Sequence, residues 1–357
     1  MKALVYPKDS NPYQELLYQP MQHYVDVKYL NSLTGSHTLN LLLLPIQIIY
    51  NRLLGFSIFH LHWSYLFVLP IKGTFWRVIS TIYYFWILLL IRLLGYKIIW
   101  TVHNVLPHNQ LFINDLLARK FLSKLSSIKI VHSKYTIEEM SSLGLDVNNV
   151  KVIPIGNYIN VYQSNINRTK ARKILNIGNK DFVFLHFGKI EPYKGVENLL
   201  KVFSRLNYPE VKLVMAGKCI NPRLQKILST YQSLPKLMII NQFIPDKDIQ
   251  LYFNAADTAV YPFEKVTTSS AVMLSLSFGI PVIYPNTGNL KDLPDNVGYS
   301  YELDDPRGLI NCLSKAIEKK EKLKILGSNA FTYAKKLNWD NISAETIRVY
   351  SELINLK

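Results

Sequence analysis

The sequence predicts an α/β protein of two Rossmann-like domains, because short apolar strands alternate with helical segments twice along its 357 residues. This length suits two domains of ordinary size. In the first half we expect strands at Lys2–Tyr6, Val25–Lys28, Ser57–Leu61, Lys97–Thr101 and Lys129–Val131. In the second half we expect them at Phe182–Phe187, Val211–Ala216, Leu237–Asn241, Thr258–Tyr261 and Pro281–Tyr284. The alternation is typical of parallel sheets whose strands are joined by helical crossovers.

Helical patterns separate the strands of the second half, near Val196–Leu206, Pro222–Ser233, Asp246–Asn254 and Ser269–Phe278. The polar stretch Asn157–Lys180 is expected to be the hinge between the halves. We therefore predict domains over residues 1–160 and 161–335. The remainder, 336–357, carries the amphipathic run Ile342–Leu353 and is predicted to be a helix that packs back on the first domain.

Composition describes a globular chain, with 49% hydrophobic and 18% charged residues. Its two cysteines, Cys219 and Cys312, imply no disulfide framework and fit a reducing compartment. The first residues enter a strand without a charged and then apolar signal pattern. A cytoplasmic location is expected.

The net charge of +16 is unevenly distributed, since no acidic residue lies between Asp26 and Asp115. That stretch is also strongly apolar, and Val78–Ile91 carries no charge at all, over a length shorter than the ~20 residues of a spanning helix. Tryptophan, tyrosine and arginine flank it, as on helices that lie in a membrane interface. An ordinary buried helix is the alternative. We expect peripheral contact with an anionic membrane surface, and no nucleic acid, because no motif for it is present.

The segment Phe182–Gly195 (FVFLHFGKIEPYKG) predicts an anion site. A buried strand ends at Gly188, Lys189 follows it, and Lys194 and Gly195 come just before a helical pattern. Ligands of open α/β sheets lie at the carboxyl ends of strands, and helix N-termini favour anions. Two cations there suit a diphosphate. Two solvated lysines on a loop are the alternative.

These residues resemble a known family. The segment FGKIEPYKG is similar to the G-R-x-x-x-x-K-G segment of GT-B glycosyltransferases of the family 4 type, with Lys189 in place of the arginine. IPIGNY (Ile153–Tyr158) and SFGIPVIYPNTG (Ser277–Gly288) resemble two further segments of that family. NPYQELLY, HLHW and TVHNVLPH resemble a bacterial subgroup, the exopolysaccharide β-mannosyltransferases of xanthan-type assembly. The resemblance implies the GT-B fold, two Rossmann-like domains that face each other across a cleft.

One departure from the family concerns two glutamates, one near the donor sugar and one at the nucleotide ribose. Their places fall on Val266 and Leu274, with Glu264 nearby but out of register. The hydroxyls of Thr267, Thr268, Ser269 and Ser270 open a helix there instead. They can cap the helix or bind phosphate, and we expect a phosphate or sugar contact.

The resemblance also implies which residues border a nucleotide-sugar donor. Besides Lys189 and Lys194, which would neutralise the departing diphosphate, the donor-binding candidates are Gly188, Lys218, Phe243, Ile244, Tyr261, Thr268, Ser269, Ser270 and Gly288. For several of them ordinary loop packing is the alternative. The D-x-D motif at Asp246 and Asp248 fits an N-cap and a first-turn acid, so we expect neither a required metal nor another cofactor.

The acceptor is expected to meet the first domain. His103 ends a strand and resembles the family histidine that contacts the donor sugar. Asp9 is the carboxylate candidate for taking the acceptor's proton, and His62 or His108 is an alternative base if its pKa is near the ordinary value. Tyr13 and Gln14 are expected to touch acceptor or donor. A structural role is the alternative for the histidines.

The sequence thus predicts a cytoplasmic, peripheral membrane glycosyltransferase. It would move a hexose from a nucleoside-diphosphate sugar, with GDP-mannose the first choice by resemblance, to a lipid-linked oligosaccharide in surface polysaccharide synthesis. The alternative is a degenerate sugar- or lipid-binding scaffold of an assembly complex, which the missing glutamates suggest.

Overall fold

The chain folds into two compact units in a computed structural model that describes residues 1–9, 11–30, 32–71 and 73–355. Unit 1 consists of Met1–Pro154 together with Trp339–Lys357, and unit 2 of Ile155–Asn338. The expected boundaries after residues 160 and 335 lie close to these. Each unit has its own hydrophobic core.

Unit 1 is built on a parallel sheet of order β2-β1-β3-β4-β5-β6. Its strands are β1 (Lys2–Tyr6), β2 (Asp26–Tyr29), β3 (Ile58–Leu61), β4 (Lys97–Val102), β5 (Ile128–Val131) and β6 (Val150–Val152). Every residue of β3 and β5 is buried, as expected for central strands covered on both faces. The crossovers are α1 (Pro12–Tyr18), α2 (His37–Leu53), α3 (Thr74–Leu93), α4 (Asp115–Leu125) and α5 (Lys134–Ser142), with a 3₁₀ turn η1 (Tyr65–Phe67).

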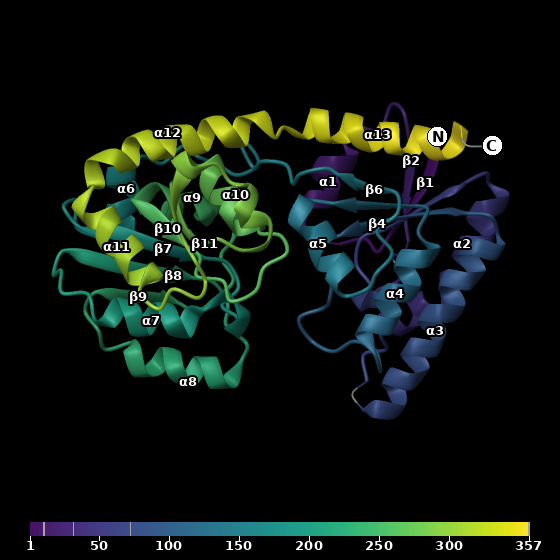
Figure 1. The fold of residues 1–357 in the computed structure, drawn as a ribbon, viewed down its shortest axis with the longest axis horizontal. Coiled ribbons are helices and arrows are strands. Elements are labelled where there is room, and N and C mark those ends of the chain that lie inside the picture. The colour runs from purple at the N-terminus through teal and green to yellow at the C-terminus, as the bar shows by residue number, and fades with distance from the viewer. Residues whose placement is uncertain (10, 31, 72, 356–357) are drawn as a thin grey trace. The chain divides into compact units, whose positions relative to one another are not determined.

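The C-terminal helix α13 (Trp339–Asn355) packs against α1 within unit 1 (Figure 1). The Ser343 hydroxyl donates to the carbonyl of Leu17 at 2.6 Å, and the Tyr350 hydroxyl lies 2.6 Å from Nδ1 of His60. The last helix is therefore tied to the centre of the first sheet by buried polar groups.

Unit 2 repeats the plan with a parallel sheet of order β12-β11-β10-β7-β8-β9. Its strands are β7 (Phe182–Phe187), β8 (Val211–Ala216), β9 (Leu237–Ile240), β10 (Thr258–Val260), β11 (Val282–Pro285) and β12 (Gly298–Tyr301). Its helices are α6 (Arg168–Ile174), α7 (Val196–Ser204), α8 (Pro222–Tyr231), α9 (Asp246–Ala255), α10 (Ser270–Ser277), α11 (Gly308–Glu318) and α12 (Lys320–Lys336). The 3₁₀ turns are η2 (Pro192–Lys194), η3 (Gly288–Asp292) and η4 (Asp295–Val297). The two parallel sheets confirm the predicted fold class.

The strands that the sequence did not predict are β6 and β12, and both lie at a sheet edge. Each is short and partly exposed, so neither shows the continuous apolar run of a central strand. Cys219 and Cys312 are buried and free.

The stretch Asn157–Lys180, expected to be a hinge, lies inside unit 2 and contains α6. Arg172 of this helix is 1% exposed. Its guanidinium donates to the carbonyls of Ala255, Gly178, Asn179 and Asp181 and pairs with Asp257 at 2.9 Å. This buried cation fixes α6 against α9 and the start of β7, so the segment is structured rather than a free linker.

Helix α3 is longer than its uncharged centre suggested. It has 20 residues and is long and apolar enough to cross a membrane by length and composition alone. Its residues Tyr84, Ile87, Leu88 and Ile91 are nevertheless fully buried in the core of unit 1. One face of α3 is therefore occupied by its own domain.

Replacing Arg172 with methionine should lower the free energy of unfolding of unit 2 by about 3–5 kcal/mol, because the change strands several buried carbonyls and weakens the pairing of Asp257. Arg168→Met is the matched control, since Arg168 pairs with the same carboxylate but its side chain is 44% exposed. Differential scanning calorimetry measures the change. Equal destabilisation by the two variants would contradict the role given to Arg172.

Candidate functional site

The predicted anion site lies where the strand order of unit 2 reverses. From β7 the chain moves to β8 and β9 on one side, whereas β10, β11 and β12 lie on the other. The connection that leaves β7 therefore leads to one side of the sheet, and the connection that leaves β10 leads to the other. Open α/β sheets bind ligands at the carboxyl ends of such strand pairs. Gly188–Lys194 follows β7, and the residues from Tyr261 to Ser269 follow β10.

Glycines let these loops approach one another closely. A Cβ on Gly217 would lie 2.0 Å from the carbonyl oxygen of Gly188, and one on Gly195 would lie 1.8 Å from that of Pro262. Both contacts are impossible for any other residue, and Gly195 also has a φ of +67°. The loops after β7, β8 and β10 thus meet because these positions lack side chains.

Lys194 is the buried cation of this loop cluster. It is 8% exposed, and its Nζ lies 3.3 Å from where a Cβ of Gly188 would be. Among the residues that the structure describes, its ammonium makes no ion pair or hydrogen bond. Burial lowers the pKa of Lys194 to about 8, opposed by Glu191 and assisted by Lys189. An anion at this ammonium would relieve that cost.

His186, which the sequence did not single out, lies beside Lys194 in the middle of this site. It is fully buried in β7, and Nδ1 donates to the carbonyl of Val260 at 2.9 Å, while Nε2 has no partner in the described part of the chain. Burial, and next the Lys194 charge, lower its pKa to about 4, so the ring is neutral. Because His186 lies within the apolar run of a strand, its sequence context gave no sign of a functional role. Lys189 and Lys218, by contrast, are exposed on the loops after β7 and β8.

The hydroxyl run has divided roles. Ser269 is the N-cap of α10, and its hydroxyl accepts from the backbone N–H of Val272. Of the two roles expected for this run, helix capping is therefore carried out by Ser269. The Ser270 hydroxyl pairs with Tyr158. The Thr268 hydroxyl is buried and has no partner in the described residues. Thr268 is therefore the member of the run that fits a ligand contact best.

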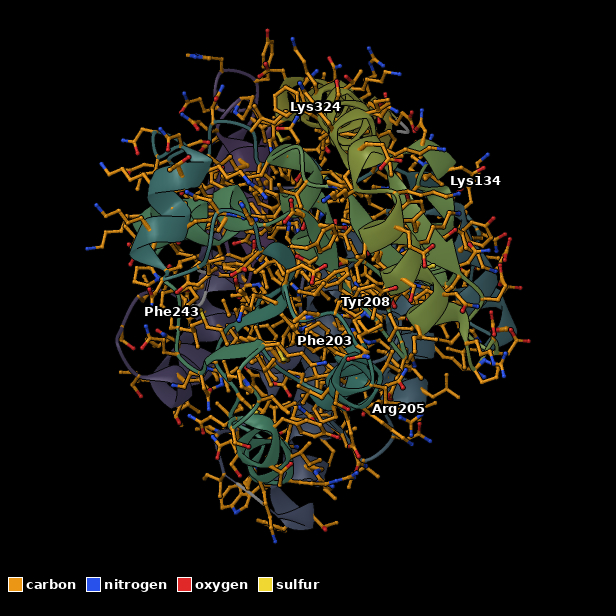
Figure 2. All side chains as sticks on the ribbon, turned by 90° about the vertical axis from the view of Figure 1, so that its left-hand side faces the viewer. Lys134, Phe203, Arg205, Tyr208, Phe243 and Lys324 are labelled. Carbon is orange, nitrogen blue, oxygen red and sulfur yellow. The ribbon has the colours of Figure 1, made fainter. Side chains whose placement is uncertain are left out.

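The other donor candidates differ in exposure. Phe243 is 73% exposed and stands at the surface of unit 2 (Figure 2), so it can meet a planar base. Ile244 is buried in the unit, and buried Tyr261 bonds to the Ser275 hydroxyl at 2.9 Å, so both support loops from beneath. A Cβ on Gly288 would lie 2.0 Å from the carbonyl of Val266, which places the loop after β11 against the loop after β10.

The positions of the two family glutamates are apolar in the structure as well. Val266 and Leu274 are buried, and Glu264 is exposed. Asp246 is the first residue of α9, with Pro245 as the N-cap, which corrects the expected N-cap by one position. No group of three or more histidine, cysteine, aspartate or glutamate side chains is arranged to hold a metal in the part of the chain that the structure describes.

Unit 1 gathers its predicted residues at the same edge of its own sheet. Four histidines follow or end neighbouring strands: His60 and His62 at β3, His103 after β4 and His132 after β5. Their rings form a hydrogen-bonded series, in which His62 Nδ1 lies 3.2 Å from His103 Nε2, and His103 Nδ1 lies 3.4 Å from His132 Nε2. We call these four residues the histidine network.

A single carbonyl determines which ring nitrogens of this network donate and which accept. Nδ1 of His132 lies 2.8 Å from the carbonyl of Ile153, and because a carbonyl only accepts, this nitrogen carries a proton. In neutral rings Nε2 of His132 then accepts from His103, and His103 in turn accepts from His62. The series ends with the Tyr18 hydroxyl, 2.7 Å from Nε2 of His62.

His60 extends the network into the centre of the sheet. Its Nδ1 lies 2.8 Å from the Tyr18 hydroxyl, and its Nε2 lies 2.7 Å from Thr101 Oγ1. Burial lowers the pKa of His60 to about 3 and that of His132 to about 4. Burial and then the neighbouring histidines lower the pKa values of His62 and His103 well below the ordinary range.

These contacts change the chemistry expected of two histidines. His62 is 2% exposed and both of its ring nitrogens are hydrogen-bonded. It therefore does not meet the condition under which it could act as a base, which was a pKa near the ordinary value. Both nitrogens of His103 are also occupied, and its ring stacks on Trp63 with centroids 4.4 Å apart. Its donor contact stays a prediction, and the structure offers the ring itself rather than a free nitrogen. His108 is exposed on the loop after β4.

Asp9 lies on the loop after β1, beside the point where the strand order of unit 1 reverses. Its carboxylate accepts from the backbone N–H of Asn11 at 2.7 Å and from the Tyr65 hydroxyl. Gln14 is 2% exposed and holds this loop, bonding to the carbonyl of Pro7 and the N–H of Asp9. Tyr13 is buried with its ring edge-on to His103. Gln14 and Tyr13 thus support the loop that carries Asp9 and the ring of His103, and their contact with acceptor or donor stays a prediction.

Comparison with known proteins identifies the domain that holds Lys194. Residues 167–333 match the family described as glycosyl transferases group 1. Unit 2 is a glycosyltransferase group 1 domain. A GDP-mannose:glycolipid 4-beta-D-mannosyltransferase of Xanthomonas campestris pv. campestris is 24% identical over 254 residues, which are 68% of this chain and 65% of that protein. The O-antigen chain mannosyltransferase B of Escherichia coli is 22% identical over 47% of this chain and 45% of its own length.

Solved structures confirm the GT-B fold over the whole chain. Sucrose-phosphate synthase from Thermosynechococcus elongatus superposes with a TM-score of 0.78 at 17% identity, covering 100% of this chain and 99% of that one. The Anabaena protein HepE, solved in complex with UDP-glucose, gives a TM-score of 0.74 at 17% identity, covering 99% and 100%. The glycosyltransferase domain is thus one half of a GT-B architecture, as the sequence predicted.

The histidine network should make unit 1 sensitive to acid. Because folding lowers these pKa values, the unfolded chain takes up protons first, and stability present above about pH 6.5 is lost as the pH falls below it. Each network histidine should lower the free energy of unfolding by about 1.4 kcal/mol for each pH unit of decrease between its unfolded and folded pKa.

His132→Gln should reduce this pH dependence of the free energy of unfolding, whereas exposed His23→Gln should not. Denaturation between pH 7 and 5 followed by tryptophan fluorescence reports unit 1, which holds all five tryptophans. An unchanged slope in His132→Gln would refute the neutral network.

Proposed function

We propose that this protein is a glycosyltransferase that moves a hexose from a nucleoside-diphosphate sugar to a lipid-linked oligosaccharide during surface polysaccharide synthesis. Unit 2 would bind the donor and unit 1 the acceptor. The observation that carries the proposal is the buried ammonium of Lys194, which has no counter-ion within the described chain. A diphosphate supplies the charge that this site lacks.

The chemistry asked of unit 2 is charge stabilisation. When the bond between the anomeric carbon and the diphosphate breaks, negative charge grows on the leaving oxygen. Lys194, assisted by exposed Lys189, is positioned to stabilise that charge in a partly dehydrated site, where such contacts are strongest. The unpartnered hydroxyl of Thr268 adds a neutral donor. This clamp can act without a divalent cation, so we propose a metal-independent reaction.

Unit 1 would supply the acceptor side. Its carboxylate candidate is Asp9, and the proton of the attacking hydroxyl would pass to this group. The hydrogen bonds from Asn11 and Tyr65 fix the carboxylate's orientation. The neutral histidine network joins the ends of β3, β4 and β5, and His103 with Trp63 offers a flat aromatic surface suited to a sugar ring.

GDP-mannose is the preferred donor. The support for it is the similarity to a GDP-mannose:glycolipid mannosyltransferase and to an O-antigen mannosyltransferase, both at low identity. The glycolipid named in the first supports a lipid-linked acceptor. Such an acceptor would place the protein at the inner face of the cell membrane, consistent with the acid-free, basic character of residues 27–114.

A degenerate scaffold that binds sugar or lipid without turnover is the second candidate. The apolar residues Val266 and Leu274 at the places of the family glutamates favour it. The buried Lys194 and the glycines that shape its loops argue for a site that binds a nucleoside diphosphate, which a scaffold for sugar or lipid alone does not need.

The first test is a panel of GDP-, UDP- and ADP-sugars, assayed for release of the nucleoside diphosphate and for thermal shift. Release with at least one donor is expected. A thermal shift without release would favour the scaffold. Neither signal with any nucleotide would refute the proposal that unit 2 binds a donor.

Replacing Lys194 with methionine should lower turnover more than ~10-fold, as loss of a transition-state charge contact does. Lys201→Met, at an exposed position on α7 in the same unit, is the matched control. Because the pKa of Lys194 is about 8, affinity for the free nucleoside diphosphate should weaken as the pH rises through that value, and the variant should lose this dependence. Calorimetric titration between pH 7 and 9.5 measures it. Near-normal turnover in Lys194→Met would remove the assigned role.

A further inference from the structure

We propose that the outward faces of α2 and α3 form a docking surface for an anionic lipid bilayer. This inference rests on the proposed function for its setting, since a lipid-linked acceptor requires such a surface, but it is argued from the exposed residues of unit 1. It assigns the contact to particular side chains of two helices.

Helix α3 carries a second apolar stripe opposite its buried one. Exposed large apolar residues recur along it at helical spacing: Phe75, Val78, Ile82, Trp86, Leu89 and Leu93. Leu93 is 84% exposed and Phe75 is 66% exposed. A helix that is apolar on all sides is typical of a buried or membrane-contacting environment, and water covers this side of α3 in the isolated chain.

Helix α2 repeats the pattern next to it. Its exposed stripe contains Leu39, Leu42, Ile46, Ile49, Tyr50 and Leu53. The two helices lie along the same edge of unit 1 (Figure 1), where the Tyr83 hydroxyl donates to the carbonyl of Leu41 and Arg52 Nε donates to that of Leu94. The buried sides of both helices pack in one core, so their exposed stripes both face away from the sheet.

The charge around this surface favours an anionic partner. Its cations gather near the C-terminal ends of both helices, where Arg92 is exposed, Lys28 lies 5.7 Å from the ring centre of Tyr50, and Lys2 reaches the carbonyl of Leu54. No acidic residue lies between Asp26 and Asp115, the stretch that contains both helices, Lys28 and Arg92, whereas Asp26 itself lies opposite Lys2 in the sheet. Apolar side chains with a basic rim and an interfacial tryptophan match the boundary of an anionic bilayer.

The same features argue against other occupants. A second copy of this chain would bring two basic rims together with no acid from this stretch to pair them. A spanning arrangement of α3 would require removing Tyr84, Ile87 and Leu88 from the core. The surface therefore suits a helix pair that lies on the bilayer with its apolar side chains inserted.

Sedimentation with vesicles tests the proposal. The full chain should bind vesicles that contain phosphatidylglycerol more tightly than pure phosphatidylcholine. Leu42→Glu/Ile82→Glu should weaken binding by more than ~10-fold, because it places charges among the inserted groups. Ile220→Glu/Ile325→Glu is the matched control, with similarly exposed residues on unit 2 (66% and 64%), and should bind as the wild type does. Arg92→Gln should cost about fivefold at low salt.

Trp86, 49% exposed on this surface, gives a second measurement. Its emission should shift to the blue on vesicle binding and be quenched by lipids brominated on their acyl chains, and Trp86→Phe should lose most of that response. The proposal is overturned if the wild type does not bind, if both double variants lose binding equally, or if light scattering shows a dimer that Leu42→Glu/Ile82→Glu dissociates. Nucleotide thermal shifts, measured without vesicles, report on the donor site separately.

Discussion

The ammonium of Lys194 is the group around which unit 2 is arranged. The fold buries a cation without a partner, and the lowering of its pKa from 10.5 to about 8 corresponds to roughly 3 kcal/mol of unfavourable burial. Only glycine at positions 195 and 217 lets the surrounding loops close on it. The neutral ring of His186 avoids adding a second charge beside it. Burial of this charge is costly without an anion and becomes favourable once an anion binds, and this difference would supply binding energy for the diphosphate that we propose.

The histidine network of unit 1 and the Lys194 loop cluster of unit 2 treat buried polar groups in opposite ways, although in the described chain unit 1 also has unpartnered buried atoms outside the network, such as the hydroxyl of Tyr84 and Nε2 of Gln47. In unit 1 the histidine network is satisfied, since the ring nitrogens of His60, His62, His103 and His132 all have a partner and the series ends on a carbonyl. In unit 2 the ammonium of Lys194, Nε2 of His186 and the hydroxyl of Thr268 are left without one in the described structure. Satisfied networks rigidify a fold, whereas unsatisfied groups in a loop cluster call for a ligand. This contrast supports donor binding by unit 2 and a preformed, rigid surface in unit 1.

The sequence predicted what depends on local pattern and missed what depends on distant contacts. Central strands such as Phe182–Phe187 were located by their apolar runs, and the sequence placed Lys194 at an anion site because a strand, a glycine and a helix start flank it within a few residues. The edge strands β6 and β12 lack such runs. The histidine network joins residues far apart in the chain, as in the contact between His60 and Tyr350. No spacing rule in one sequence brings those residues together, so the condition under which His62 could act as a base, a pKa near the ordinary value, could not be checked before its neighbours were known.

The replacement of two acidic positions by Val266 and Leu274 has a consequence for the reaction. Both side chains are buried, so a carboxylate at either place would need a partner to stay charged. Without those acids, the charged neighbours that act on Lys194 are Glu191, which raises its pKa, and Lys189, which lowers it. In the proposed reaction, the proton of the acceptor would then be taken by a group outside this cluster. Between Asp26 and Asp115 unit 1 has no carboxylate to offer, and the buried histidines are neutral with low pKa values. We propose Asp9 for this task, because it lies at a strand end where the strand order of unit 1 reverses and its carboxylate is held by the N–H of Asn11.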